Sequence, residues 1–386
     1  MTLLARPDAP AAIAERRRNR PDLILLAAMI ILASVGLLMI YSVTRVGLER
    51  SDLPASVSME RQMIFVAAGL IAFLVASLID YREYSHLVPY IYGVVLFLLG
   101  VVFLFPAVKG AQRWIDLGPF QLQPSEFAKI ACVIALAGVL SRPRVKLPWL
   151  VIGRVLLLVA IPGVLIFLQP DLGTMLVFGF VTLVMLFMSG LSGRQMLVLS
   201  GAAALGTFAI FRLGLVRDYQ LDRLRVLLDP ALDPQGIGWN LRQSRIAIGS
   251  GQLLGKGLFQ GQQTNFEFVP EQGSDFIFTA VGEQLGFVGG ILLVLAYALI
   301  VWRLLVIATN SRDRFGAMIS VGVAAIIAFH AFINIGMTMG IMPVTGLPLP
   351  FVSSGGSSFL AFAFALGIAN SVWLRRSPLP AEYRDS

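Results

Sequence analysis

Long apolar stretches separated by short polar connections make up most of the chain. A helix needs about 20 apolar residues to cross the ~30 Å hydrocarbon core of a bilayer, and most of these stretches approach that length. They are continuous rather than alternating, so they favour helices over the strands of a membrane barrel. We therefore predict an all-α polytopic membrane protein with ten spans, at residues 23–43, 63–79, 87–105, 125–140, 150–168, 173–189, 196–211, 283–306, 315–337 and 357–374.

Composition supports this prediction. The 386 residues are 57% hydrophobic and 13% charged, whereas soluble domains are about 25% charged. A soluble enzyme and a disordered chain are both excluded. One cysteine permits no internal disulfide, and two distant histidines do not suggest zinc. No basic stretch interleaved with aromatic residues indicates a nucleic-acid partner.

Lysine and arginine in the loops predict the orientation, because cytoplasmic loops are enriched in both. With the N-terminus inside, the cytoplasmic segments carry 16 of these residues and the short outer loops 5. We expect cytoplasmic tails at residues 1–21 and 377–386, and a single transmembrane domain at 22–376. The first apolar run is too long for a signal peptide and is predicted to be an uncleaved span.

The segment between the seventh and eighth spans, residues 212–274, is predicted to be a large extracytoplasmic loop. It carries seven lysines and arginines, but long loops cross membranes largely regardless of charge. It is rich in apolar and turn residues, so we expect it to be ordered.

Charged residues gather around the start of the fourth span. Pro124 marks the helix start, and Glu126 and Lys129 share a helix face on which they can pair. That pair is either structural or the lining of an outward-facing cavity. In the preceding outer loop, Lys109 and Arg113 are candidate phosphate ligands.

Two aspartates stand at the edges of later spans. Asp171 begins the sixth span, where helix capping is sufficient to explain it. Asp275 is the last ionisable residue before an apolar run, and Glu283 lies eight residues deeper. A carboxylate at such a water–lipid boundary is placed to act as a general base toward a sugar hydroxyl. The alternative for Asp275 is capping.

A proline-rich segment precedes the last span. Pro343, Pro348 and Pro350 exclude a regular helix, so the segment is expected to be a loop buried against protein. The backbone N–H groups of residues 353–358 are candidates for binding an anion at the start of the last span. A simple turn and cap is the alternative.

These motifs resemble, in order and spacing, the shape, elongation, division and sporulation (SEDS) family of bacterial membrane proteins. The resemblance covers nearly the whole chain and is carried by residues 109–129, 169–174, 225–289 and 340–358. The sequence GWNLRQSRIAIGSGQLLGKG, followed by FVPEQGSDFIF, is more similar to the elongation branch than to the division branch.

The resemblance implies ten transmembrane helices and a peptidoglycan glycosyltransferase. Such an enzyme polymerises lipid II at the outer face of the bacterial cytoplasmic (inner) membrane during cell elongation, maintaining rod shape. The implied partners are a class B penicillin-binding protein, which supplies the transpeptidase, and other proteins of the elongation complex.

The resemblance also implies residue roles. Asp275 corresponds to the essential acidic residue, acting either as the general base or as the ligand of a divalent cation held against the pyrophosphate; no other cofactor is expected. Ser354 stands where the family commonly has tyrosine in Ser-Tyr-Gly-Gly-Ser. The candidate substrate-binding residues are Lys109, Arg113, Trp114, Glu126, Lys129, Arg242, Arg245, Lys256, Ser353 and Ser357.

Two other functions remain open at this stage. A lipid II flippase is compatible with ten spans and intramembrane charge, although it requires polar groups through the full membrane depth. A non-catalytic scaffold that activates the penicillin-binding protein predicts that Asp275 is dispensable. The concentration of motifs on the outer side favours catalysis.

Overall fold

The computed structural model describes residues 20–376, apart from 108–110, 119, 143–146, 213, 215–217 and 230–231. Lys109 and nearly all of both predicted tails therefore lie outside the described residues. The described chain is almost entirely helical, which confirms the predicted class.

Ten long helices correspond in order to the ten predicted spans. By length and apolar composition, seven of the described helices can cross a membrane, the third together with a 3₁₀ turn at Val102–Leu104. The ten are α2 (Leu23–Arg50), α3 (Val57–Leu78), α4 (Glu83–Val101), α5 (Pro124–Leu140), α6 (Trp149–Leu168), α7 (Leu172–Met188), α8 (Gly193–Arg212), α12 (Ile277–Thr309), α13 (Arg314–Met339) and α14 (Gly356–Leu374).

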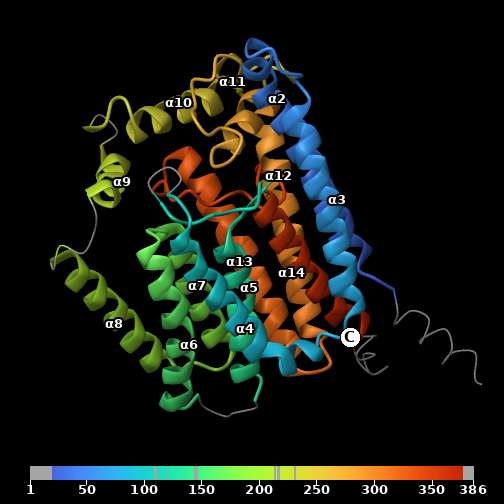
Figure 1. The fold of residues 1–386 in the computed structure, drawn as a ribbon, viewed down its shortest axis with the longest axis vertical. Helices are drawn as coiled ribbons and strands as arrows, with labels where there is room; N and C mark the ends of the chain where they lie inside the picture. Colours follow the sequence, from blue (N-terminus) through green and yellow to red (C-terminus); the bar gives the residue numbers. More distant parts are fainter. Residues whose placement is uncertain are drawn as a thin grey trace, which may run out of the picture.

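Helices α13 and α14 form the centre of the bundle, with α5 beside them and α8 at the edge (Figure 1). In the most apolar 18-residue stretch of α13, 78% of the residues are buried, whereas in that of α4 17% are buried. Small residues permit close packing between membrane helices. Gly367 of α14 lies against the Phe73 backbone of α3, and Gly69 of α3 lies against the Phe359 ring of α14. The low burial of α4 leaves most of that helix to face lipid.

The short strands before α5 and the helices of the 212–274 loop lie at one end of the bundle (Figure 1). An antiparallel pair of short strands, β1 (Ile115–Asp116) and β2 (Gln121–Leu122), precedes α5. Three helices lie within the predicted loop at 212–274: α9 (Asp218–Leu228), α10 (Ile237–Ser250) and α11 (Gln262–Asn265). Helix α10 packs on α12 and α13, and α11 packs on α2 and α12, so this part of the loop is ordered against the bundle, whereas α9 packs on α10.

A kink at Gly286 divides α12, because that residue has φ +65° and ψ −162°. The break exposes backbone groups that the loop before α11 satisfies. The Lys256 N–H donates to the Glu283 carbonyl at 3.0 Å, and the Phe287 N–H donates to the Gln252 carbonyl at 2.8 Å. Helix α12 begins at residue 277, six residues before the predicted start, because Glu283 is buried with partners rather than marking the water boundary.

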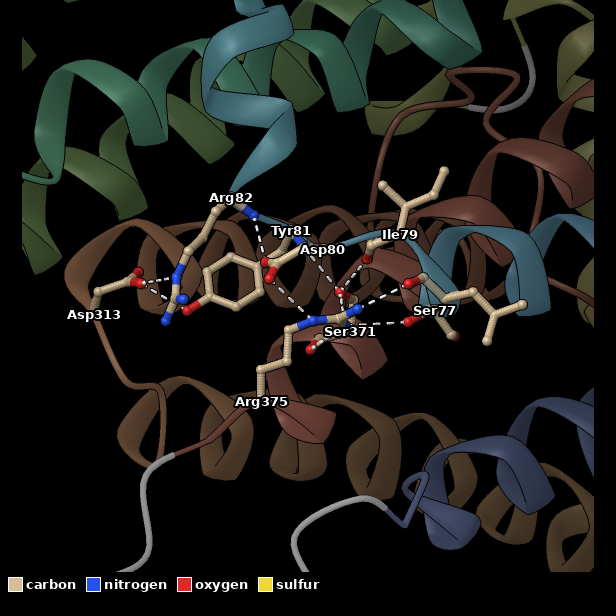
Figure 2. Close-up of polar contacts among 9 residues, drawn as sticks. Ser77, Ile79, Asp80, Tyr81, Arg82, Asp313, Ser371 and Arg375 are labelled. Atoms are coloured by element: carbon tan, nitrogen blue, oxygen red, sulfur yellow. Dashed lines mark hydrogen bonds and ion pairs between the residues drawn. The ribbon is translucent and has the colours of Figure 1, made fainter.

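At the opposite end of the bundle, a polar network links the connection between α3 and α4 to the start of α13 and the end of α14 (Figure 2). The Tyr81 hydroxyl donates to Asp313 at 2.6 Å, and Arg82 pairs with the same carboxylate at 3.2 Å. Arg375 pairs with Asp80 at 3.2 Å and donates to the Ser371 hydroxyl. Burial, followed by the Asp313 hydrogen bond, raises the pKa of Tyr81 to about 12.

Candidate functional site

Asp275 lies between the 212–274 loop and the buried start of α12. Its backbone N–H donates to the Glu271 carbonyl at 3.1 Å, and its side chain is half-buried. The next residues, Phe276 and Ile277, are 3% and 0% exposed. The carboxylate therefore stands where the polar loop meets the apolar helix.

The proline-rich segment, residues 340–355, joins α13 to α14 without forming a helix, as its prolines predict. Its apolar side chains, including Leu347 and Leu349, are buried against the bundle. Gly346 has φ +74°, a left-handed conformation that favours glycine. A Cβ added to Gly346 would lie 3.4 Å from Asp275 Oδ2. The segment thus runs directly beside the Asp275 carboxylate.

Two side chains of α13 fix this arrangement. The Asn334 amide donates to the carbonyls of Asp275 and Leu347, both at 2.8 Å. One helical turn earlier, His330 Nδ1 lies 3.1 Å from the Pro348 carbonyl. Helix α13 therefore holds two consecutive carbonyls of the proline-rich segment together with the backbone of Asp275.

Glu126 and Lys129 form the predicted pair, at 2.8 Å between Lys129 Nζ and Glu126 Oε1. Both are buried, at 2% and 3% exposure. Lys129 Nζ also lies 2.9 Å from His330 Nε2 and 5.4 Å from the centre of the Phe362 ring. Neither charged end faces an open surface in this structure, so the arrangement favours the structural alternative for this pair.

Arg113 holds the turn between α6 and α7. Its guanidinium donates to the Gln169 carbonyl at 3.1 Å and to the Pro170 carbonyl, and it lies 3.8 Å from Asp171. Asp171 caps α7, accepting from the Thr174 N–H at 3.1 Å, as predicted. The guanidinium is thus occupied by protein groups.

The three candidate cations of the 212–274 loop, Arg242, Arg245 and Lys256, have different surroundings. Lys256 pairs at 3.2 Å with Glu283, whose carboxylate also accepts from two backbone N–H groups at the start of α11. Arg242 donates to the Pro234 carbonyl at 3.1 Å. Arg245 is exposed and donates at 3.0 Å to Gly340, the first residue of the proline-rich segment. Within the described residues, Lys256 thus pairs with a carboxylate, whereas the two arginines donate to backbone carbonyls.

The candidate serines are engaged with the backbone. The Ser353 hydroxyl donates to the Ser274 carbonyl and accepts from the Leu349 N–H at 2.9 Å. The Ser357 hydroxyl donates to the Gln121 carbonyl at 2.9 Å, which joins β2 to the start of α14. The Ser353 hydroxyl therefore stabilises the loop that leads to Asp275, and the Ser357 hydroxyl stabilises the strand pair before α5. Trp114 is half-buried in the loop before α5.

Sequence reasoning did not identify Asn334 and His330 as site residues. Each is a polar side chain in an apolar run, where polar groups are costly unless they have partners. That signal is present in the sequence for both residues. Their partners near Asp275, however, are backbone carbonyls, which no residue pattern reveals.

Within the described parts of residues 20–376, no three His, Cys, Asp or Glu side chains form a group that could hold a metal ion. A divalent cation at Asp275 would need further oxygen ligands from substrate and water.

Residues 22–377 match the family of cell cycle proteins that comprises FtsW, RodA and SpoVE. Peptidoglycan glycosyltransferase MrdB of Escherichia coli K12 is 42% identical over 325 residues, covering 83% of this chain and 87% of the relative. Stage V sporulation protein E of Bacillus subtilis is 35% identical, covering 92% of this chain and 98% of the relative.

Two solved structures share the fold. A chain from a peptidoglycan synthase complex, described as coordinating polymerization and crosslinking, is 30% identical with a TM-score of 0.78; the match covers 92% of this chain and 97% of that one. The rod shape determining protein RodA of Thermus thermophilus is 29% identical with a TM-score of 0.68, covering 93% of this chain and 98% of that one.

Proposed function

This chain belongs to the FtsW, RodA and SpoVE family of cell cycle proteins, and from that premise we propose that it polymerises lipid II into peptidoglycan glycan strands, with Asp275 as general base. It is a multi-span membrane protein, and its relatives include named peptidoglycan glycosyltransferases. The observation that carries the proposal is the half-buried Asp275 carboxylate beside Gly346, at the loop-rich end of the bundle.

The reaction follows from the position of that carboxylate. The polyprenyl tails of two lipid-linked substrates stay in the bilayer, while their sugars reach the end of the bundle. Asp275 removes the proton from the 4-hydroxyl of the acceptor sugar. The oxygen attacks the anomeric carbon of the growing strand, and the bond to polyprenyl pyrophosphate breaks. The electron pair leaves on the pyrophosphate, and the anomeric centre is inverted.

The leaving pyrophosphate needs positive charge, and the surroundings of the candidate cations rank them. Arg245 is exposed and makes one backbone hydrogen bond, to the segment that runs beside Asp275. Arg242 lies on the same helix and also donates to a backbone carbonyl. We assign pyrophosphate binding to these two arginines. Lys129 and Lys256 are paired with carboxylates, so we assign them structural roles. We also assign a structural role to Arg113, because its guanidinium holds the turn between α6 and α7.

A divalent cation would add to this charge by contacting Asp275 and the pyrophosphate oxygens. The arginines of α10 and the carboxylate of Asp275 keep their assigned roles in either case.

The orientation is proposed from charge and from the two ends of α12. Asp275 precedes the start of that helix, whereas Arg303 near its other end pairs with Asp22 at the start of α2. The excess of lysine and arginine in the loops on the Asp22 side indicates the cytoplasm. We therefore place both termini in the cytoplasm of a bacterium and Asp275 at the outer face of its inner membrane.

A class B penicillin-binding protein is the partner we assign, with other elongation-complex proteins. The support is the likeness to a chain from a solved complex that coordinates polymerization and crosslinking. Such a partner would crosslink the strands that this chain polymerises.

The test measures glycan-chain formation from purified lipid II by this protein with its class B partner. Wild type and Asp275→Asn are compared, with moenomycin present to silence contaminating polymerases of another type. We expect polymer from wild type only. Polymer from the Asn variant would refute the role of Asp275. A folded wild-type complex that makes no polymer would refute the activity and favour lipid II transport or a scaffold function.

A further inference from the structure

His330 lies inside the bundle, between the buried pair of α5 and the proline-rich segment. It is 0% exposed. Its Nε2 lies 2.9 Å from Lys129 Nζ, and its Nδ1 lies 3.1 Å from the Pro348 carbonyl. Its ring meets the Phe362 ring edge-on, with centroids 5.0 Å apart. Both ring nitrogens therefore contact groups on different parts of the chain.

The partners determine the protonation of the ring. A lysine ammonium has donors and no acceptor, so it donates to Nε2, which must be unprotonated. A carbonyl only accepts, so Nδ1 carries the proton that it donates to Pro348. His330 is thus neutral, in the Nδ1–H form. Glu126 balances the charge of Lys129, as a buried ammonium requires.

The position of His330 on α13 connects this chain of contacts to Asp275. His330 and Asn334 are four residues apart, so they lie on one face of the helix. They hold the adjacent carbonyls of Pro348 and Leu347. The preceding residue, Gly346, is the one that lies against the Asp275 carboxylate.

We propose that His330 is a positioning residue for the glycosyl-transfer reaction. The Glu126–Lys129 pair on α5 fixes the His330 ring, and the ring in turn fixes the Pro348 carbonyl. These contacts hold Gly346 at the distance from Asp275 that the reaction requires. This inference rests on the proposed polymerase function and adds to it a residue that does not touch the substrate.

A purely structural histidine would make a different prediction. Its loss would lower the amount or the thermal stability of the folded protein and leave the turnover of each folded molecule unchanged. A positioning residue affects kcat while leaving the KM for lipid II nearly constant, because a misplacement of about 1 Å at a reacting group can cost about 10²-fold in rate.

The test uses three substitutions at His330 that remove its hydrogen bonds stepwise. In His330→Gln, the amide can accept from Lys129 and donate to Pro348. In His330→Asn, the shorter amide can reach only Pro348. In His330→Phe, the ring volume stays and both hydrogen bonds are lost. The matched control is Ser320→Ala, because Ser320 is also fully buried on α13 but bonds only within its own helix, to Gly316 at 2.9 Å.

We expect kcat of the complex with the class B partner to fall in the order Gln, Asn, Phe. The Gln variant should stay within about threefold of wild type and the Phe variant should lose about 10²-fold, with the KM for lipid II within about twofold. Ser320→Ala should keep the wild-type kcat. Hydrogen–deuterium exchange provides a readout without activity: the Leu349 N–H, which bonds to Ser353, should exchange faster in the Asn and Phe variants than in the Gln variant.

Wild-type kcat in folded His330→Asn or His330→Phe would overturn the proposal, as would unchanged exchange at Leu349. Should the Phe variant not fold, equal kcat of the Gln and Asn variants would overturn it. Inactivity of wild type under the same conditions would instead refute the polymerase function itself, so the two failures are distinguishable.

Discussion

Asn334 on α13 donates a 2.8 Å hydrogen bond to the backbone carbonyl of Asp275, which lies 59 residues earlier in the sequence. The same amide nitrogen donates to Leu347 in the proline-rich segment, also at 2.8 Å. A single buried side chain therefore sets the relative position of the candidate base and the loop beside it. This contact is a stronger constraint than a loop could supply alone, because α13 is a largely buried helix of the bundle.

Asn334→Ala should impair both stability and polymerisation. One buried and one partly buried carbonyl lose their donor, which costs about 1–3 kcal/mol of folding free energy. The shift of Asp275 should lower the polymerisation rate by about 10²-fold. The measurement compares thermal unfolding and lipid II polymerisation with those of Asn310→Ala, whose side chain bonds locally to the Val306 carbonyl. A wild-type rate in the folded Asn334 variant would contradict the positioning role.

Gly346→Ala separates backbone strain from crowding at the site. A left-handed alanine costs about 1–2 kcal/mol, and the new methyl group would stand 3.4 Å from Asp275 Oδ2. Gly190→Ala is the matched control, because Gly190 also has positive φ, +97°, and its added Cβ meets nothing within 4 Å. Both variants should lose similar stability, measured by thermal unfolding. Only Gly346→Ala should lose polymerase activity; equal activity of the two would refute the contact.

The ten apolar runs were sufficient to predict the helical class and the order of the long helices, because burial in lipid imposes a compositional signal. The start of α12 was misplaced because Glu283 reads as a boundary residue, although its carboxylate is buried against α11. The sequence also marks Asp275. It does not reveal that Asn334 and His330 converge there, since both act on backbone carbonyls brought close by the fold.

Tyr81→Phe should change how stability depends on alkaline pH. The folded pKa of Tyr81 is about 12, raised from 10.0 mainly by burial and then by the Asp313 hydrogen bond. A raised pKa contributes stability that is fully present below pH 10 and is lost as pH rises through about 12. The variant lacks the hydrogen bond to Asp313, so it should be less stable than wild type at pH 8.

The two unfolding curves of wild type and Tyr81→Phe should converge between pH 10 and pH 12, and thermal unfolding across this range is the measurement. A constant difference in unfolding temperature up to pH 12 would show that Tyr81 does not titrate as its contact with Asp313 requires. Polymerisation at neutral pH should change little, because this network lies at the end of α13 opposite the candidate site.

Lys256 and Arg245 lie in the same 212–274 segment, and replacing each with methionine should have opposite effects. Lys256→Met leaves the fully buried Glu283 without its cation, and a weakened buried carboxylate costs about 1–3 kcal/mol. Its folded molecules should polymerise lipid II at nearly the wild-type rate.

Arg245→Met removes an exposed guanidinium, so stability should change by no more than about 0.5 kcal/mol. Its polymerisation rate should fall by about 10- to 100-fold, because charge that stabilises the leaving pyrophosphate is lost. Thermal unfolding and polymerisation of the two variants, measured side by side, separate the roles. The reverse pattern, a stable but inactive Lys256 variant and an active Arg245 variant, would move the pyrophosphate site from α10 to the kink of α12.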